Sequence, residues 1–128
     1  DKKMEHSVLK TVTAYLNSNG GTLLVGVSNN GEILGLEQDT FANTDQLNLH
    51  LTNLIKDHIG PEFMPFINFE IVGIEGKDVL KIDCEKSDKH VFLKNGDEEE
   101  FYVRSGPSSA KLSGRALIDY IKNNFGGL

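Results

Sequence analysis

The sequence predicts an α+β fold, in which a mixed or mostly antiparallel sheet of about six strands has three helices packed against it. Two observations support this class. Strand-like segments follow one another directly instead of alternating singly with helices, and the turn signals Asn30-Gly31 and Asn95-Gly96 can join neighbouring strands as hairpins. The 128 residues suit one domain, and no linker or repeat divides residues 1–128. Since the chain starts at Asp1, we expect a single domain taken from a longer protein.

The first half of the chain predicts a helix, a strand, a returning strand and a second helix. Apolar residues recur every three or four positions over residues 4–17 and 44–59, as on the buried side of amphipathic helices. The continuous apolar run Thr22–Val27 predicts a central strand that is covered on both faces. Residues 32–36 would return from the Asn30-Gly31 turn as the hairpin partner of this strand.

The second half predicts four more strands and a last helix. Apolar residues with strand spacing occupy residues 66–74, 79–84, 91–93 and 101–103. The turn at Asn95-Gly96 joins the last two of these strands as a hairpin. Ser113 would then cap a helix that ends near Phe125. Cys84 stands at an apolar position of the alternating pattern, so we expect a thiol buried in the core.

The composition excludes several classes of protein. With 38% hydrophobic and 25% charged residues the chain resembles an ordinary globular protein, and no apolar run approaches the roughly 18 residues of a membrane span. A single cysteine excludes an internal disulfide and suits a reducing compartment, so we expect a cytoplasmic location without membrane contact. The net charge of -6 argues against a chain that coats nucleic acid with its whole surface. Any nucleic-acid contact must therefore come from a local patch or from a partner domain.

One candidate contact follows the first helix. Gly20 and Gly21 could expose backbone N–H groups to a phosphate or a nucleobase, or could merely let the helix reverse into a closely packed strand. Neither the G-x-x-x-x-G-K-S/T loop nor the G-x-G-x-x-G loop is present, so the common nucleotide-binding loops are absent from the sequence.

The other candidate contact lies at the end of a predicted strand. There Arg104 offers a planar guanidinium that suits bidentate phosphate recognition, close to the N-terminus of the last helix. Alternatively, Arg104 pairs with Glu99 or Glu100, or donates to nearby carbonyl groups. His90 would approach this strand end only if the strand over residues 91–93 pairs beside residues 101–103. The candidate binding residues are Arg104, Ser105, Ser108, Ser109, Lys111, Gly20, Gly21, His90 and Lys94.

Two longer motifs carry a family resemblance. AYLNSNGGTLLVGVSNNGEILGL, residues 14–36, and EEFYVRSGPSSAKLSG, residues 99–114, together resemble the Schlafen-type AlbA-like domain, also described as a DNA-binding domain of divergent AAA ATPases. The resemblance implies a module that binds DNA or RNA within a larger regulatory or defence protein, with the other domains of that protein as partners. It spans nearly the whole chain with the motifs in the family's order.

The resemblance does not extend to the nuclease site of the family's ribonucleases. Where they carry a carboxylate after the Gly-Gly strand, this sequence has Ser28, Asn29 and Asn30, and the family's upstream E…EFK segment is not visible. A metal-dependent nuclease needs clustered carboxylates around its cation. We therefore expect no catalytic residue, no metal site and no cofactor.

Two alternatives remain open at this stage. The chain could be a fragment of a metal-dependent endoribonuclease whose upstream strand, with the E…EFK segment, is cut away. Cleavage that requires Mn²⁺ would instead indicate a carboxylate cluster formed by the fold from Glu5, Glu32 and the acidic run Asp97–Glu100, which we otherwise expect to be a solvated loop. It could also be a protein-interaction or oligomerisation module that forms homo-oligomers and never touches nucleic acid.

Overall fold

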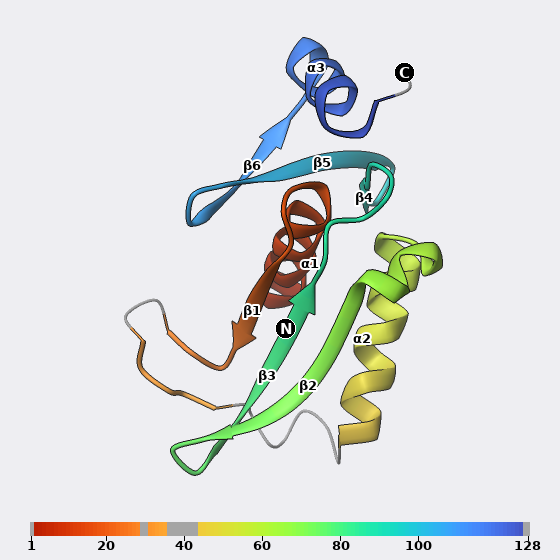
Figure 1. The fold of residues 1–128 in the computed structure, drawn as a ribbon. Helices are drawn as coiled ribbons and strands as arrows, with labels where there is room; N and C mark the ends of the chain where they lie inside the picture. The colour runs from red at the N-terminus through yellow and green to blue at the C-terminus, as the bar shows by residue number, and fades with distance from the viewer. Residues whose placement is uncertain (1, 29–30, 36–43, 127–128) are drawn as a thin grey trace.

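The computed structural model describes residues 2–28, 31–35 and 44–126, and Figure 1 shows how their helices and strands are arranged. In chain order they are α1 (Lys2–Asn17), β1 (Gly21–Val25), α2 (Thr44–His58), a short 3₁₀-helix η1 (Pro61–Phe66), β2 (Ile67–Ile74), β3 (Lys77–Cys84), β4 (Leu93–Asn95), β5 (Glu98–Ser105), β6 (Ser108–Leu112) and α3 (Gly114–Phe125). The α+β class, the number of about six strands and the three α-helices are confirmed over the described residues, although one predicted strand is replaced by another.

The strands form two sheets, where the sequence predicted one. The first sheet has the order β1-β3-β2 and the second the order β4-β5-β6, and every pairing is antiparallel. Helix α1 lies between them (Figure 1), because its buried side chains share one core with Ile82 of the first sheet and with Leu93 and Tyr102 of the second. One amphipathic helix therefore covers two sheets, a pairing that periodicity alone cannot indicate.

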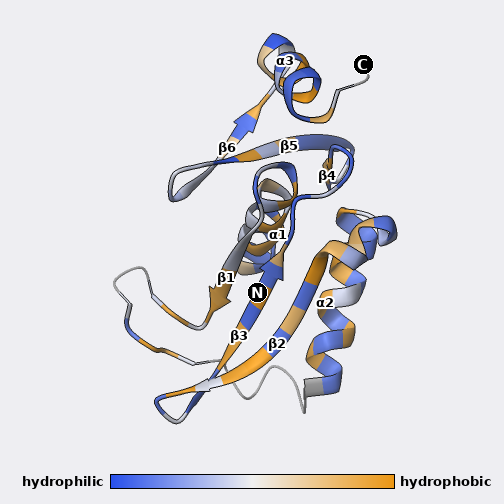
Figure 2. Cartoon of the chain, viewed as in Figure 1, coloured by the Kyte–Doolittle hydropathy of each residue, from blue (hydrophilic) through white to orange (hydrophobic). Residues whose placement is uncertain are grey.

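Among the described residues, helices cover only one face of the first sheet. Leu23 and Ile82 pair across β1 and β3 on the face toward α1 and α2, whereas Leu24 and Lys81 pair on the outer face. Figure 2 shows apolar residues along β1 and β2. The prediction that β1 is a central strand covered on both faces is wrong: β1 is an edge strand, and Leu24 is 39% exposed. The central strand is β3, in which apolar and polar residues alternate. Such alternation suits a sheet with one face in the core and one face in solvent, whereas a continuous apolar run does not.

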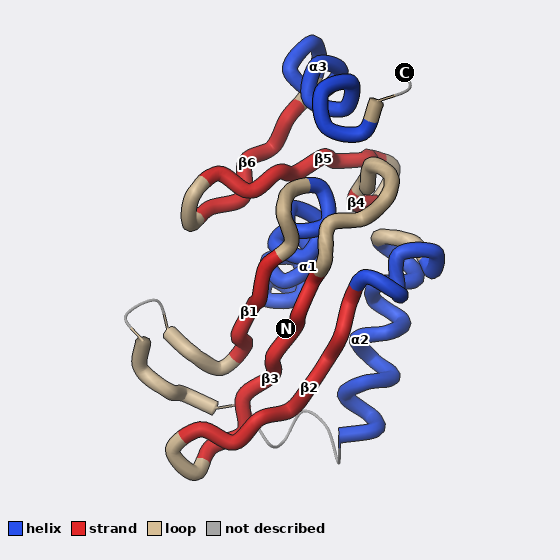
Figure 3. The backbone as a smooth tube through the Cα atoms, in the orientation of Figure 1, coloured by secondary structure: helices blue, strands red, loops and turns tan. Residues whose placement is uncertain are grey.

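Over residues 32–35, the part of it that the structure describes, the predicted strand over residues 32–36 does not form. A single bridge joins Val27 to Ile33, and Figure 3 draws this stretch as loop. Gly26 explains where the pairing ends, since its φ of 105° favours glycine and a Cβ there would lie 3.1 Å from the backbone of Gly35. Asn30 of the predicted turn and Leu36 lie outside the described residues.

The second sheet contains one predicted hairpin and one strand that the sequence did not reveal. The β4–β5 hairpin turns at Gly96, as predicted. Strand β6, which holds Ser108, Ser109 and Lys111, was missed because its polar residues look like a loop; it pairs Arg104 with Ser109. Side chains of β5 alternate between the aromatic cluster under α3 and the face toward α1.

A buried asparagine ties the end of α1 to the second sheet and to α3. Asn17 at the end of α1 is fully buried, its Nδ2 donates to the carbonyls of Val91 (2.9 Å) and Tyr102 (3.0 Å), and its Oδ1 accepts from Val91 N (2.8 Å). The Tyr120 hydroxyl of α3 donates to the Asn17 carbonyl at 2.5 Å. The helix end thus fixes both the second sheet and α3, because each of these buried polar groups needs its partner.

The lone cysteine and the helices agree with the sequence. Cys84 is buried, as expected, and burial followed by the charge of Asp83 raises the pKa of its thiol to about 12. The thiol therefore stays protonated at neutral pH. None of the helices in the described residues combines the length and the apolar character that crossing a bilayer requires.

Candidate nucleic-acid interface

The two sequence motifs meet around Tyr15, a half-buried residue in the last turn of α1. Its hydroxyl donates to the carbonyl of Thr22 at 3.2 Å. The guanidinium carbon of Arg104 lies over its ring, 5.1 Å from the ring centre. We call this surface the Tyr15 patch, and it consists of Tyr15, Gly20, Gly21, Arg104, Ser105, Ser108 and Ser109. Six of the nine candidate binding residues therefore lie together, although nothing in the sequence linked residue 21 to residue 104.

The two glycines have a structural role in this patch. A Cβ on Gly21 would lie 2.5 Å from Cε1 of Tyr15, and a Cβ on Gly20 would lie 2.5 Å from the carbonyl oxygen of Cys84. Gly20 also has a φ of 77°, and its N–H donates to the Tyr15 carbonyl at 3.0 Å. The chain can turn from α1 into β1 this close to Tyr15 and Cys84 because neither glycine has a side chain. The Gly20 amide is engaged within the fold, so it is not an open phosphate donor.

Arg104 is held by its own hairpin. Its Nη1 donates to Ser109 Oγ at 3.1 Å, and its Nη2 donates to the Pro107 carbonyl at 2.8 Å. Its main-chain N–H donates to Ser18 Oγ at 2.8 Å, which ties β5 to the end of α1. The structure thus realises the predicted contact of Arg104 with a carbonyl group, and the alternative pairing with Glu99 or Glu100 does not occur.

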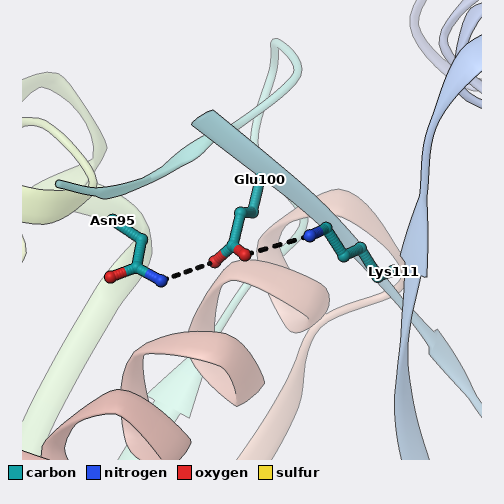
Figure 4. A network of polar contacts seen from close by, with 3 residues as sticks. All are labelled: Asn95, Glu100 and Lys111. Carbon is teal, nitrogen blue, oxygen red and sulfur yellow. Dashed lines mark hydrogen bonds and ion pairs between the residues drawn. The ribbon is translucent and has the colours of Figure 1, made fainter. Parts of the chain in front are cut away.

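Glu100 instead pairs with Lys111 (Figure 4). Glu100 is only 7% exposed, its Oε2 lies 3.1 Å from Lys111 Nζ, and Asn95 donates to its Oε1 at 3.4 Å. Burial by itself would raise the pKa of Glu100, but the hydrogen bond and charge of Lys111, with further hydrogen bonds from Tyr102 and Asn95, hold it below 4.5. The expectation that Asp97–Glu100 is a solvated loop is wrong for the last three of these residues, which belong to β5, and Glu100 is also buried because β5 turns its side chain toward α1. Lys111 is therefore a neutralised cation.

His90 and Lys94 lie away from the Tyr15 patch. The His90 ring stands edge-on to Phe92 at 5.8 Å and to Phe125 at 6.2 Å, within the aromatic surroundings of α3. Arg104 points to the opposite face of the second sheet, toward α1. The expectation that His90 comes near Arg104 is wrong, because His90 precedes β4 and packs against Phe92 and Phe125, whereas Arg104 lies over Tyr15 of α1. Lys94 is exposed on β4, and its carbonyl lies 2.9 Å from His58 Nδ1.

Sequence reasoning missed three residues of this region. Tyr15 was assigned to the apolar side of its helix, and nothing distinguished it from a core residue. Ser18 Oγ accepts a hydrogen bond from the main-chain N–H of Arg104. The adjacent Asn-Ser pair at the helix end could have indicated a polar contact there. Lys10 lies one and a half turns before Tyr15, with its Nζ 5.7 Å from the centre of the Tyr102 ring. Two cation–aromatic pairs thus stand two residues apart on β5.

The carboxylates suggested for a nuclease site are dispersed. Glu5 pairs with His50 of α2 at 2.7 Å, Glu100 pairs with Lys111, and Glu32 lies in the loop after β1. Among the residues that the structure describes, no three His, Cys, Asp or Glu side chains come close enough to hold a metal ion. These residues do not fit the cation of a metal-dependent nuclease.

Comparison with known proteins agrees with the two motifs. Residues 1–113 match the family described as Schlafen, AlbA_2. The fold is similar to that of the DIP2311 protein from Corynebacterium diphtheriae, with a TM-score of 0.64 and 19% sequence identity. That match covers 99% of this chain and 20% of the bacterial chain, so this domain spans about one fifth of the protein it resembles.

Proposed function

Because this chain belongs to the Schlafen AlbA_2 family, we propose that it is the DNA- or RNA-binding module of a larger regulatory or defence protein, without catalytic activity of its own. The observation that carries this proposal is the convergence of both motifs on the Tyr15 patch. The DIP2311 chain, five times longer than the matched region, supports the presence of further domains in the parent protein. The one cysteine of this chain is a buried free thiol, which suits a cytoplasmic location.

The charges of the chain favour a local interface. With a net charge of -6, most of the surface repels a polyanion, so attraction depends on the cations that remain available. Arg104 and Lys10 stand over tyrosine rings on the α1 side of the second sheet, whereas Lys111 is neutralised by Glu100. The exposed serines at the β5–β6 turn add hydroxyl groups of the kind that bind sugar and phosphate oxygens.

The absence of catalysis is proposed from the chemistry of the patch. Phosphoryl transfer needs either a metal held by carboxylates or several donors and a general base converging on one site. The Tyr15 patch offers Arg104 and hydroxyl groups but no carboxylate or histidine. Hydrolysis would then come from another domain of the parent protein.

A binding titration tests this function. Single- and double-stranded DNA and RNA are titrated at two salt concentrations, with Arg104→Ala as the patch variant and Arg115→Ala, on the exposed side of α3, as its control. We expect salt-dependent binding that Arg104→Ala weakens for all sequences and that Arg115→Ala leaves unchanged. Failure of the wild-type protein to bind any of the four, or binding that is equal in both variants, would reject the proposal and favour a protein-interaction module.

A further inference from the structure

Arg104 is arranged to use its flat face rather than its edge. Nη1 and Nη2 are the two nitrogens that a bidentate phosphate contact employs most directly, and each already donates to an acceptor within the hairpin, Ser109 Oγ and the Pro107 carbonyl. The Tyr15 ring covers one side of the guanidinium. Arg104 is of intermediate burial, so part of the residue stays accessible to solvent beside these contacts.

The fold holds this face in place before any ligand arrives. Two hydrogen bonds fix the end of the side chain, Ser18 fixes the main chain of Arg104, and Tyr15 is itself tied to Thr22. A side chain that is already ordered loses little conformational entropy on binding. Planar ligands with π-electrons stack well on a guanidinium, and nucleobases do so in proteins that bind unpaired strands.

We infer that the Tyr15 patch binds single-stranded nucleic acid by stacking an unpaired base on the guanidinium of Arg104. This inference rests on the proposed function and names its ligand. Inside a duplex both faces of every base are covered by neighbouring bases, so a base must be unpaired to reach Arg104. Stacking also contributes affinity without requiring many cations, which suits a chain with a net charge of -6 better than a duplex with one charge per about 1.7 Å does.

The neighbouring groups suit the rest of a nucleotide. Ser105 and Ser108 are exposed at the turn beside Arg104, and Gly106 between them has open space around its Cα. The Ser105 hydroxyl can donate to the phosphate of the stacked nucleotide, whereas Ser108 Oγ donates to the Ser105 carbonyl at 3.1 Å and can still accept a hydrogen bond from the ligand. Lys10, over the Tyr102 ring two residues along β5, can attract the next phosphate.

An abasic strand separates stacking from charge. A fluorescent single strand of about 12 nucleotides, within the site size of single-strand binders, is compared with the same strand carrying several abasic positions and with its duplex. The abasic strand keeps every phosphate and loses the bases. We expect the wild-type protein to bind the intact strand about tenfold more tightly than the duplex, and to lose between about 5-fold and about 150-fold on the abasic strand.

Arg104→Lys keeps the positive charge and removes the planar guanidinium on which a base would stack. We expect this variant to bind intact and abasic strands equally, at the level that the wild-type protein shows for the abasic strand. Arg115→Lys serves as the matched control, and thermal melting checks that each variant is folded. Equal wild-type affinity for intact and abasic strands, or full affinity in Arg104→Lys, overturns the stacking inference while leaving the proposed function standing. No wild-type binding to any strand overturns both.

Discussion

The two faces of the second sheet differ in what they contribute. Toward α3, β5 presents Phe101 and Val103, which are 1% and 8% exposed and pack with Ile121 and other apolar residues. Toward α1, the same strand presents Glu100 and Arg104, each with specific polar partners. One strand therefore carries a hydrophobic face that stabilises the fold and a polar face that supplies the candidate interface. Substitutions on the two faces should separate stability from binding.

The largest effect is expected on the α3 face, from Phe101→Ala. Removing this ring leaves a cavity between β5 and α3 and breaks its contacts with Phe92 and Tyr120, whose ring centres lie 5.3 and 5.8 Å away. We expect a loss of about 3 to 5 kcal/mol in the free energy of unfolding, measured by urea denaturation. Oligonucleotide affinity should persist wherever the variant is still folded. A loss below about 1 kcal/mol would mean that this face is not the stabilising one.

Asn17→Ala should have the next largest effect, because it removes the buried side-chain amide that ties the end of α1 to the second sheet. It leaves the Val91 amide and the carbonyls of Val91 and Tyr102 buried without their partner. We expect a loss of about 2 to 4 kcal/mol in the free energy of unfolding. Asn19→Ala, an exposed asparagine of the same motif, is the control and should change stability by less than about 0.5 kcal/mol. Similar losses in both variants would show that the buried amide does not tie these elements together.

Glu100→Gln tests the polar face through its dependence on pH. The folded protein holds the pKa of Glu100 below the 4.5 of an unperturbed glutamate, so its carboxylate stabilises the fold above about pH 4.5. That contribution is lost as the pH falls through the folded-state pKa. Urea denaturation between about pH 7 and about pH 3 should show a smaller acid-induced loss in Glu100→Gln than in the wild-type protein.

The exposed neighbour Glu99 provides the comparison for this measurement. Glu99→Gln removes a carboxylate from the same strand without removing the Lys111 pair. We expect its acid-induced loss of stability to match that of the wild-type protein. If both variants follow the wild-type profile, the Glu100–Lys111 pair contributes nothing measurable, as many exposed ion pairs do.

The last prediction is that the isolated domain has no effect on RNA. The isolated domain should leave tRNA and single-stranded RNA intact with Mg²⁺, with Mn²⁺ and with EDTA, since His90 and Arg104 lie on opposite faces of the second sheet. Gel analysis of end-labelled RNA checks this. Cleavage that survives EDTA and disappears in His90→Ala would contradict this separation of the faces, and cleavage that requires Mn²⁺ would reveal a carboxylate site.

The correct sequence predictions rest on local signals. Helix periodicity located α1, α2 and α3, and the Asn95-Gly96 signal located the β4–β5 hairpin. The failures share a different cause. The apolar run of β1 suggested a central strand, and the polar sequence of β6 concealed a strand, because the position of a strand in a sheet depends on partners that are distant in sequence.

The candidate site shows the same division. Motif chemistry selected Gly20, Gly21 and Arg104, since glycine turns and a strand-end guanidinium can be recognised from the residues themselves. Their meeting at Tyr15 could not be foreseen, because it depends on how the end of α1 packs against the β5–β6 hairpin. His90 was assigned to the site because a strand over residues 91–93 was expected to pair beside residues 101–103. The strand that pairs is instead Leu93–Asn95, opposite Glu98–Glu100, so His90 precedes it and packs against Phe92 and Phe125.

By itself, the sequence determined the fold class, the helices, the buried thiol of Cys84 and the two motifs that carry the family resemblance, because each depends on residue type and spacing along the chain. The tertiary structure decided that the strands divide into two sheets, and that Asn17 ties α1 to the second sheet and to α3. It also decided that Glu100 pairs with Lys111 while Arg104 lies over Tyr15. These are contacts between segments up to 89 residues apart in number, from Tyr15 to Arg104. Their geometry follows from packing and register, which no local pattern encodes.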